Sequence, residues 1–366
     1  MSRAVPLARR TLAAEPRRLA AAASGVGLAL MLILLLDGLW AGINSKATLY
    51  ADNVGADLFV AQPGTKNFLG AMSVIPMSTL DEVEALPDVR WATPVRGLFS
   101  IMDLHGTKVP AYLIGYRPGG RGGPWRMLDG RAPSADDEVA IGDLLRERHG
   151  IEVGDQVDIL GRSLTVVGIA DADTFMSSFV FMTHAVTDEL LRLPSTTSWI
   201  LVGTDRPAAV RRELETSDVA VLDRATLRTN DLAVLSKPFA TPLRVMLAVA
   251  FVVGSLIIAL TAYSAIIEHQ REYGIVKALG ATNRRLHRLA LVQSMVIASA
   301  GLATGAAFFI AGRWAIVSIR PQFTVMVTAA SVGRAVGLAV AMGAVAAIVP
   351  ARRLSKLDPS RAFGVG

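Results

Sequence analysis

Residues 268–285 read EHQREYGIVKALGATNRR, a charged segment enclosed between two long apolar runs. The apolar runs on either side are long enough to cross a bilayer, so the segment itself lies outside the hydrocarbon core. Basic residues crowd this short connection, namely Arg271, Lys277, Arg284, Arg285 and Arg288. Short loops that are dense in Arg and Lys remain on the cytoplasmic side of the membrane. The segment therefore predicts a membrane protein that presents a compact, charged and partly helical surface to the cytoplasm.

The composition indicates a chain that is partly embedded in the membrane and partly exposed to water. Of the 366 residues, 52% are apolar and 19% are charged, and the mean hydropathy is +0.44. A membrane-spanning helix needs roughly 20 predominantly apolar residues. Four stretches meet this length, and we expect transmembrane helices at 19–43, 241–267, 289–312 and 332–350.

The distribution of charge predicts the topology of the chain. Segments 1–18, 268–288 and 351–366 together hold 14 basic and four acidic residues, whereas residues 44–240 hold 19 basic and 26 acidic residues. Basic flanks stay inside, so we expect both termini and the 268–288 segment in the cytoplasm and residues 44–240 outside. The net charge of +6 is thereby explained without nucleic-acid binding. The excess of Arg over Lys favours a bacterial source, and we expect a multi-pass protein of the cytoplasmic (inner) membrane.

The segments between the spans complete this expected organisation. Residues 1–18 are expected to form a cytoplasmic amphipathic helix on the membrane surface. A short external loop is expected at 313–331 and a cytoplasmic tail at 351–366. An alternative for the first apolar run is a cleaved signal peptide, although the run exceeds the usual length of a signal h-region. The fold class is thus membrane α-helical, with four transmembrane helices and a large extracytoplasmic domain inserted between helices 1 and 2.

The inserted domain, residues 44–240, is expected to be α+β. Alternating apolar residues predict strands at 56–61, 109–114, 156–159 and 163–169. Helices are expected at 78–86, with a serine or threonine N-cap, and at 205–217, after which residues 223–242 connect to the second span. The glycine-rich stretch 118–124 is expected to be a flexible turn.

Several kinds of chemistry are missing from the sequence. There is no cysteine, and the five histidines show no paired metal spacing. Neither a G-x-S-x-G nucleophile elbow nor a phosphate-binding G-x-x-x-x-G-K-[ST] loop occurs. We therefore expect a non-catalytic subunit without a cofactor or metal of its own, and a separate chain that hydrolyses ATP.

The sequence resembles the MacB/FtsX-like permease family, the membrane subunits of a class of ABC transporters. Residues 271–281, REYGIVKALGA, are similar to the cytoplasmic loop of that family. Residues 55–58, GADL, resemble the start of its external domain, and residues 350–353, PARR, followed by DPSRAF at 358–363, resemble its C-terminal tail. Tyr273 and Phe363 stand where aliphatic residues are more usual in the family. Residues 138–169 resemble the second lobe of the MacB-type external domain.

The resemblance implies a function by mechanotransmission. A cytoplasmic ABC ATPase, with ATP and Mg²⁺ bound on that partner, would move the 268–288 loop, and the membrane helices would carry the motion to the external domain to export or extrude a substrate. The permease would work in the lipid bilayer as a dimer, and a homodimer is favoured. Whether an extracytoplasmic adaptor or membrane fusion protein also takes part stays open. Family members extrude peptides, lipids, lipoproteins or drugs. The alternatives are an FtsX-like signal transmitter that regulates a cell-wall hydrolase, and a membrane enzyme.

The candidate site is the 268–288 segment as a coupling element, against the alternative of an interfacial helix that only reverses the chain. Glu272 and Lys277 are expected on the polar side, with Ile275 and Leu279 packing, while Gly280 breaks the helix. The full set of expected coupling residues is Glu268, Arg271, Glu272, Gly274, Lys277, Gly280, Ala281, Asn283 and Arg284.

Two features of the spans are also candidates for function. Asp37 is an acid within the first span, and it is either a functional intramembrane group or a solvated boundary residue. The sequences at 301–305 and 333–337 are both G-x-x-x-G, which permits close helix contact. These glycines serve either packing within the chain or a dimer interface. Arg244, Arg313, Arg320 and Arg334 are expected to extend toward the membrane surface.

Overall fold

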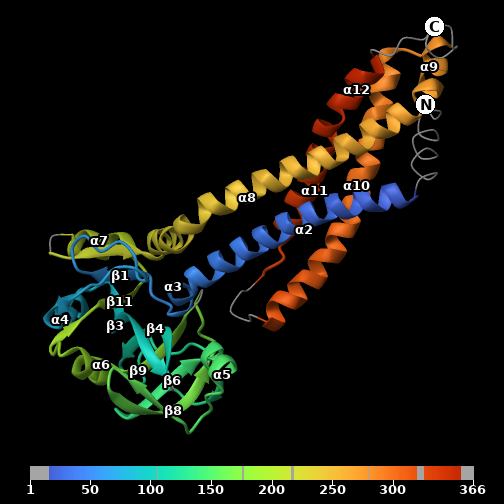
Figure 1. Ribbon diagram of the computed structural model, residues 1–366. Coiled ribbons are helices and arrows are strands. Elements are labelled where there is room, and N and C mark those ends of the chain that lie inside the picture. The colour runs from blue at the N-terminus through green and yellow to red at the C-terminus, as the bar shows by residue number, and fades with distance from the viewer. Residues whose placement is uncertain are drawn as a thin grey trace. The chain divides into compact units, whose positions relative to one another are not determined.

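The computed structural model describes residues 16–104, 106–174, 177–215, 218–279, 281–319 and 325–355 (Figure 1). These residues divide into two compact units. The α+β unit consists of Gly42–Phe239, and the helical unit contains the described residues before 42 and after 239. Residues 1–15 of the amphipathic helix expected at 1–18, and residues 356–366 of the tail expected at 351–366, lie outside the described residues.

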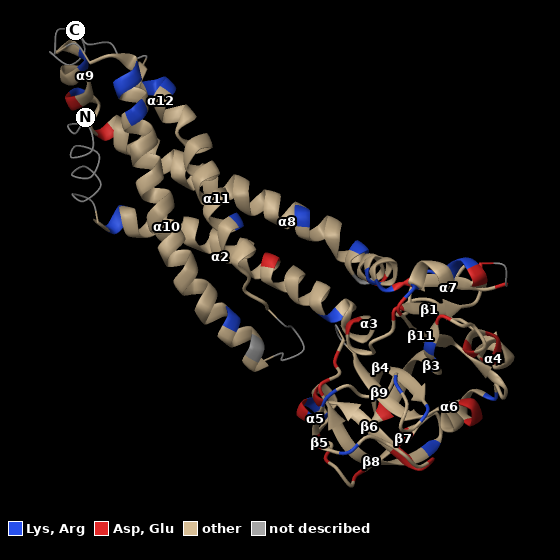
Figure 2. Cartoon of the chain, turned by 180° about the vertical axis from the view of Figure 1, so that it is seen from behind, with Lys and Arg blue, Asp and Glu red and all other residues tan. Residues whose placement is uncertain are grey.

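The helical unit is built from helices that are mostly apolar along their length. Figure 2 shows few charged residues in the middle of these helices. Its helices are α2 (Pro16–Ala47), α8 (Arg224–Glu268), α9 (Gln270–Ala278), α10 (Asn283–Ile319), α11 (Ala329–Ala346) and α12 (Ile348–Ser355). Four segments among the described residues are long and apolar enough to cross a membrane, namely Pro16–Ala47, Ser236–Glu268, Asn283–Ile316 and Ala329–Ser355.

The helices differ in extent from the apolar runs that predicted them. Residues 223–242, which were expected to lead to the second span, do so as a helix, because α8 is helical from Arg224 onward. The carboxylate of Asp223 accepts a hydrogen bond from the backbone N–H of Thr226 at 2.7 Å, which caps the helix start. Helix α10 continues to Ile319, so the loop expected at 313–331 is partly helical. Hydropathy marks only the apolar part of a helix, whereas capping and packing decide where the helix ends.

Small residues bring α2 and α10 into close contact. A Cβ atom on Gly27 would lie 2.4 Å from Thr304 Oγ1, and one on Gly301 would lie 2.4 Å from Val26 Cγ1. The first G-x-x-x-G sequence therefore serves packing within the chain. In contrast, a Cβ atom on Gly333 or Gly337 would meet no described atom within 4 Å.

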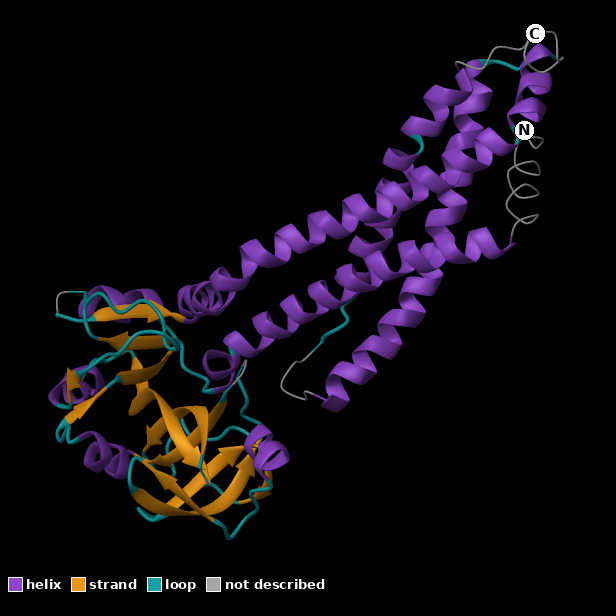
Figure 3. Ribbon diagram, viewed as in Figure 1, coloured by secondary structure: helices purple, strands orange, loops and turns teal. Residues whose placement is uncertain are grey.

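The α+β unit is organised around a mixed ten-stranded sheet (Figure 3). The strand order is β12-β1-β11-β3-β4-β9-β6-β8-β5, and β7 pairs with both β3 and β8. The pairs β4–β9 and β6–β8 are parallel and the others are antiparallel. The strands of this sheet are β1 (Leu58–Ala61), β3 (Val89–Leu104), β4 (Thr107–Tyr116), β5 (Met127–Gly130), β6 (Glu138–Gly142), β7 (Gln156–Ile159), β8 (Arg162–Ala170), β9 (Ser178–Thr183), β11 (Trp199–Thr204) and β12 (Ala220–Asp223).

A two-stranded sheet and five short helices complete the α+β unit. The small sheet pairs β2 (Ile75–Pro76) with β10 (Thr196–Thr197). The helices are α3 (Leu49–Asn53), α4 (Ser78–Glu84), α5 (Asp143–His149), α6 (His184–Leu191) and α7 (Pro207–Leu214). The strands and helices predicted for this unit are therefore present. The predicted serine or threonine cap of α4 is wrong, because Met77 occupies the N-cap and no side chain caps the helix.

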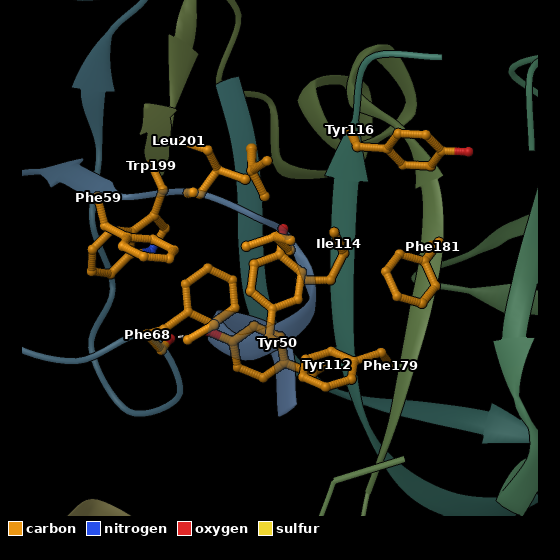
Figure 4. Packing of buried hydrophobic residues seen from close by; sticks show 14 of the residues in the cluster. Tyr50, Phe59, Phe68, Tyr112, Ile114, Tyr116, Phe179, Phe181, Trp199 and Leu201 are labelled. Atoms are coloured by element: carbon orange, nitrogen blue, oxygen red, sulfur yellow. Dashed lines mark hydrogen bonds between the residues drawn. The ribbon is translucent and has the colours of Figure 1, made fainter. Parts of the chain in front are cut away.

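An aromatic cluster forms one core of the α+β unit (Figure 4). Tyr50 stacks on Phe68 with ring centroids 4.3 Å apart, and Trp199 lies 5.5 Å from Phe68. The Tyr112 hydroxyl donates to the Phe68 carbonyl, and burial raises the pKa of Tyr112 well above its ordinary value, so this donor keeps its proton. The Tyr50 hydroxyl donates to the Gly122 carbonyl at 2.9 Å, which ties the glycine-rich loop to the core.

Asp231 of α8 holds the loop that carries Phe68. Its Oδ1 accepts hydrogen bonds from the backbone N–H groups of Phe68, at 2.7 Å, and Leu69, at 3.1 Å. The Asp231 side chain is nearly inaccessible, and burial raises its pKa to about 7. Ionising this carboxyl therefore costs free energy in the folded unit that it does not cost in the unfolded chain.

We expect the stability of residues 44–240, expressed alone, to fall as the pH rises from about 4 to about 7, because only the folded state keeps the Asp231 proton there. Asp231→Asn keeps an oxygen acceptor but cannot ionise, so its pH dependence should be flatter. Thermal unfolding of both proteins from pH 4 to pH 8 measures the difference. His184, whose pKa burial lowers, acts with the opposite sign but is common to both proteins. Parallel curves would show that Asp231 does not titrate in this range.

Candidate coupling site

Helix α9 occupies the middle of the charged segment at 268–288. Glu272 stands in its first turn, where a negative charge is favourable next to the helix N-terminus. Its Oε1 lies 3.2 Å from Nδ1 of His269. The helix ends at Ala278, and the backbone N–H of Ala281 donates to the Val276 carbonyl at 3.2 Å. Gly280 lies outside the described residues, so its expected role as the helix breaker stays a prediction.

Tyr273 anchors α9 to three other helices. Tyr273 is 4% exposed and belongs to a cluster that includes residues of α8, α10 and α12. The other buried members of this cluster are Ile266, Leu286, Leu289, Ala290 and Leu354. Tyr273 therefore packs α9 against the ends of the helices around it.

A buried hydrogen bond reinforces this anchor. Nε2 of Gln293 donates to the Tyr273 hydroxyl at 3.1 Å, and Gln293 is completely buried in α10. Neither Tyr273 nor Gln293 is among the coupling residues expected from the sequence. The sequence contained a signal for Gln293, which is an amide inside the apolar stretch LALVQSMVI at 289–297. An amide in such a stretch needs a polar partner.

The expected division of α9 into polar and packing sides is wrong for this chain. Lys277 stands four residues after Tyr273 and thus shares its inward face, and its Nζ donates to the backbone carbonyl of Ser355 in α12 at 2.8 Å. Ile275 and Leu279, which were expected to pack, are 39% and 83% exposed. The reason is the helical phase, since burial of Tyr273 turns the opposite side of α9 outward.

The outward face of α9 carries Glu272 and Ile275 and continues into Leu279, the C-cap residue. These three residues follow the i, i+3, i+7 spacing of one helix face. Of the other expected coupling residues, Gly274 is buried and Ala281 is half-buried. Arg271, Asn283, Arg284 and Glu268 are exposed, and Glu268 forms an ion pair with Arg18 of α2. Exposed apolar side chains beside charged ones are typical of a surface that binds another protein.

Asp37 forms a two-pronged ion pair with Arg334. Nε and Nη2 of Arg334 lie 2.9 and 2.7 Å from the two carboxylate oxygens. Asp37 is ten residues before the end of α2, and its side chain is only 15% exposed. Arg334, which was expected to extend toward the membrane surface, is thus paired with Asp37 while 54% of its side chain stays exposed. The pair compensates the cost of an acid within a span and joins α2 to α11.

The described residues contain no group of three or more His, Cys, Asp or Glu side chains that could hold a metal ion. The expectation that this chain carries no metal or cofactor stays a prediction.

Two family models together match almost the whole chain. The model described as MacB-like periplasmic core domain matches residues 19–217, and the model described as FtsX-like permease C-terminal matches residues 244–359. The chain belongs to the MacB/FtsX-like family of ABC transporter permeases. The predicted fold class, four membrane helices with a large extracytoplasmic α+β domain between the first and second, is thereby confirmed.

Relatives of similar length share the family. An uncharacterised ABC transporter permease of Mycobacterium tuberculosis is 28% identical over 359 residues, which cover 95% of this chain and 96% of that protein. A second one, from Mycobacterium bovis, is 28% identical over 360 residues with the same coverage.

Among solved structures, the α+β unit is similar to the periplasmic region of MacB from Actinobacillus actinomycetemcomitans. The TM-score is 0.38 at 13% identity, and the match covers 49% of this chain and 94% of that one. The extracellular domain of the ABC-type transporter YknZ from Gram-positive bacteria matches with a TM-score of 0.36 at 13% identity, over 46% of this chain and 99% of that one.

Proposed function

We propose that this permease converts ATP-driven motion of a separate cytoplasmic ATPase into motion of its α+β unit, and thereby exports or extrudes a substrate. The observation that carries the proposal is the two-sided character of α9. Its outward face, Glu272, Ile275 and Leu279, is free to receive a partner, while Tyr273 on the other side is packed against α8, α10 and α12.

The membrane helices provide a continuous path for such motion. Helix α2 begins in the helical unit and its last turn belongs to the α+β unit, and α8 likewise begins in the α+β unit and ends beside α9. A helix transmits displacement along its axis because each turn is hydrogen-bonded to the next. No connecting loop interrupts either helix, which favours transmission over a passive anchor.

The proposed assembly contains two copies of the permease and two ATPase chains in a bacterial cytoplasmic membrane. Both termini and α9 face the cytoplasm in this proposal, because the basic residues of the chain concentrate in these segments. An ATPase that binds α9 must approach from the cytoplasm, so a test of this binding also tests the orientation.

Glu272→Lys is expected to weaken binding of the cognate ATPase about tenfold, or about 1.4 kcal/mol, because the substitution reverses the charge at one end of the outward face. The permease and its ATPase are co-expressed, purified through a tag on the permease, and compared for bound ATPase and for ATP hydrolysis per complex. The fold should be intact, since Glu272 is exposed.

Glu147→Lys is the matched control, because Glu147 is an exposed helical acid of the α+β unit and undergoes the same charge reversal. It should leave ATPase binding unchanged. Full ATPase binding by both variants would show that α9 is only a connector, whereas equal loss in both would indicate a general effect of charge.

A further inference from the structure

A cavity of about 280 Å³ lies beside the Asp37–Arg334 ion pair, within the helical unit. Its apolar wall comes from Leu36 and Trp40 of α2 and from Leu243 and Leu247 of α8. Its polar lining consists of Asp37, Arg334 and a second arginine, Arg244 of α8. The cavity therefore combines an apolar surface with two cations and one anion.

The charges in this cavity do not balance. Arg334 already engages both oxygens of Asp37, and no hydrogen bond or ion pair joins Arg244 to another described residue. Arg244 is exposed, and 54% of the Arg334 side chain is also exposed. One positive charge thus remains without a counter-charge among the described residues, on a wall that is otherwise apolar.

The depth of the two arginines places this charge near the membrane surface. Arg244 stands eight residues after Ser236, where the second apolar segment begins, and Arg334 stands five residues after the start of α11. At about 1.5 Å of rise per residue, both Cα atoms lie within about 12 Å of those helix ends. Long arginine side chains at this depth reach the level of the lipid headgroups.

Lipid phosphate is the anion that every bilayer presents at this level, and a guanidinium binds phosphate through two parallel hydrogen bonds. The apolar wall matches the first methylenes of the acyl chains of the same lipid, which free phosphate lacks. We propose that this cavity binds the headgroup of an anionic membrane lipid, with Arg244 as the principal phosphate ligand and Arg334 as the second. Asp37 orients Arg334 and weakens binding by its negative charge.

The test uses the full-length permease, delipidated in a neutral detergent and titrated with phosphatidylglycerol or phosphatidylcholine. Native mass spectrometry measures the bound lipid. Phosphatidylglycerol should bind about tenfold more tightly than phosphatidylcholine, because the choline cation of phosphatidylcholine compensates the charge of its phosphate. Arg244→Gln should remove this preference, since one charge-assisted interaction changes a dissociation constant by about that factor. Asp37→Asn should strengthen phosphatidylglycerol binding, since it removes the only anion of the cavity.

Arg313→Gln is the matched control, because Arg313 is an exposed arginine of α10 that does not line this cavity. It should bind phosphatidylglycerol like the wild type. Equal losses in Arg244→Gln and Arg313→Gln would overturn the proposal in favour of general surface attraction. Equal binding of the two lipids would also overturn it, as would displacement of phosphatidylglycerol by millimolar inorganic phosphate. The Arg244→Gln variant remains informative even if Asp37→Asn fails to fold.

Discussion

Tyr273→Ala is expected to release α9 from the membrane helices and to uncouple ATP hydrolysis from movement of the permease. Removing a buried aromatic side chain costs roughly 3–5 kcal/mol, and Tyr273 provides the largest buried contact of this nine-residue helix. Hydrogen–deuterium exchange of the α9 amides measures the release. A local loss of 3 kcal/mol corresponds to roughly a hundredfold faster exchange.

A graded pair of variants separates packing from hydrogen bonding at this position. Tyr273→Phe keeps the ring but removes the hydroxyl that accepts from Gln293, so we expect a smaller cost of roughly 1–3 kcal/mol. Arg271→Ala serves as the control, because Arg271 is exposed on the same helix and its loss should not change exchange. Unchanged exchange in Tyr273→Ala would mean that α9 is held by contacts other than this cluster.

Gly27→Ala is expected to destabilise the helical unit, although alanine is the better helix former by about 1 kcal/mol. The added Cβ would lie 2.4 Å from Thr304 Oγ1 and 3.0 Å from the backbone nitrogen of Gly305. Thr304 also cannot yield freely, because its hydroxyl donates to the Ala23 carbonyl at 2.7 Å. Overpacking of this kind costs about 1–3 kcal/mol, so the melting temperature of the purified permease should fall by several degrees.

Gly337→Ala is the control for this experiment and should have the opposite sign. A Cβ atom at this position meets nothing within 4 Å among the described residues, so the gain in helix propensity is expected to remain. Thermal unfolding in the same detergent compares the two variants. A melting temperature for Gly27→Ala at or above that of the wild type would refute the close contact between α2 and α10.

Local sequence patterns predicted those helices and strands for which a single contribution to the folding free energy dominates. The four spans follow from apolar length alone, because transfer into hydrocarbon depends on composition and not on neighbours. Strand β7 coincides with the alternation seen at 156–159, since one face of that strand is buried and the other is wet. The segment 268–288 was located for the same reason, as a charged segment between apolar runs must leave the membrane.

Side-chain partners and helix phase were decided by the tertiary structure. The face of α9 that packs is set by Tyr273 meeting Leu354 and Leu289, which lie in other helices, so Lys277 turns inward against expectation. Asp37 and Arg334 are 297 residues apart, and Asp231 holds a loop 163 residues before it. The sequence by itself therefore determined the four spans, the α+β insertion and the position of the charged segment 268–288. Only the folded chain determined which charges are compensated and which side of each helix is free, because these depend on contacts between residues that no local pattern relates.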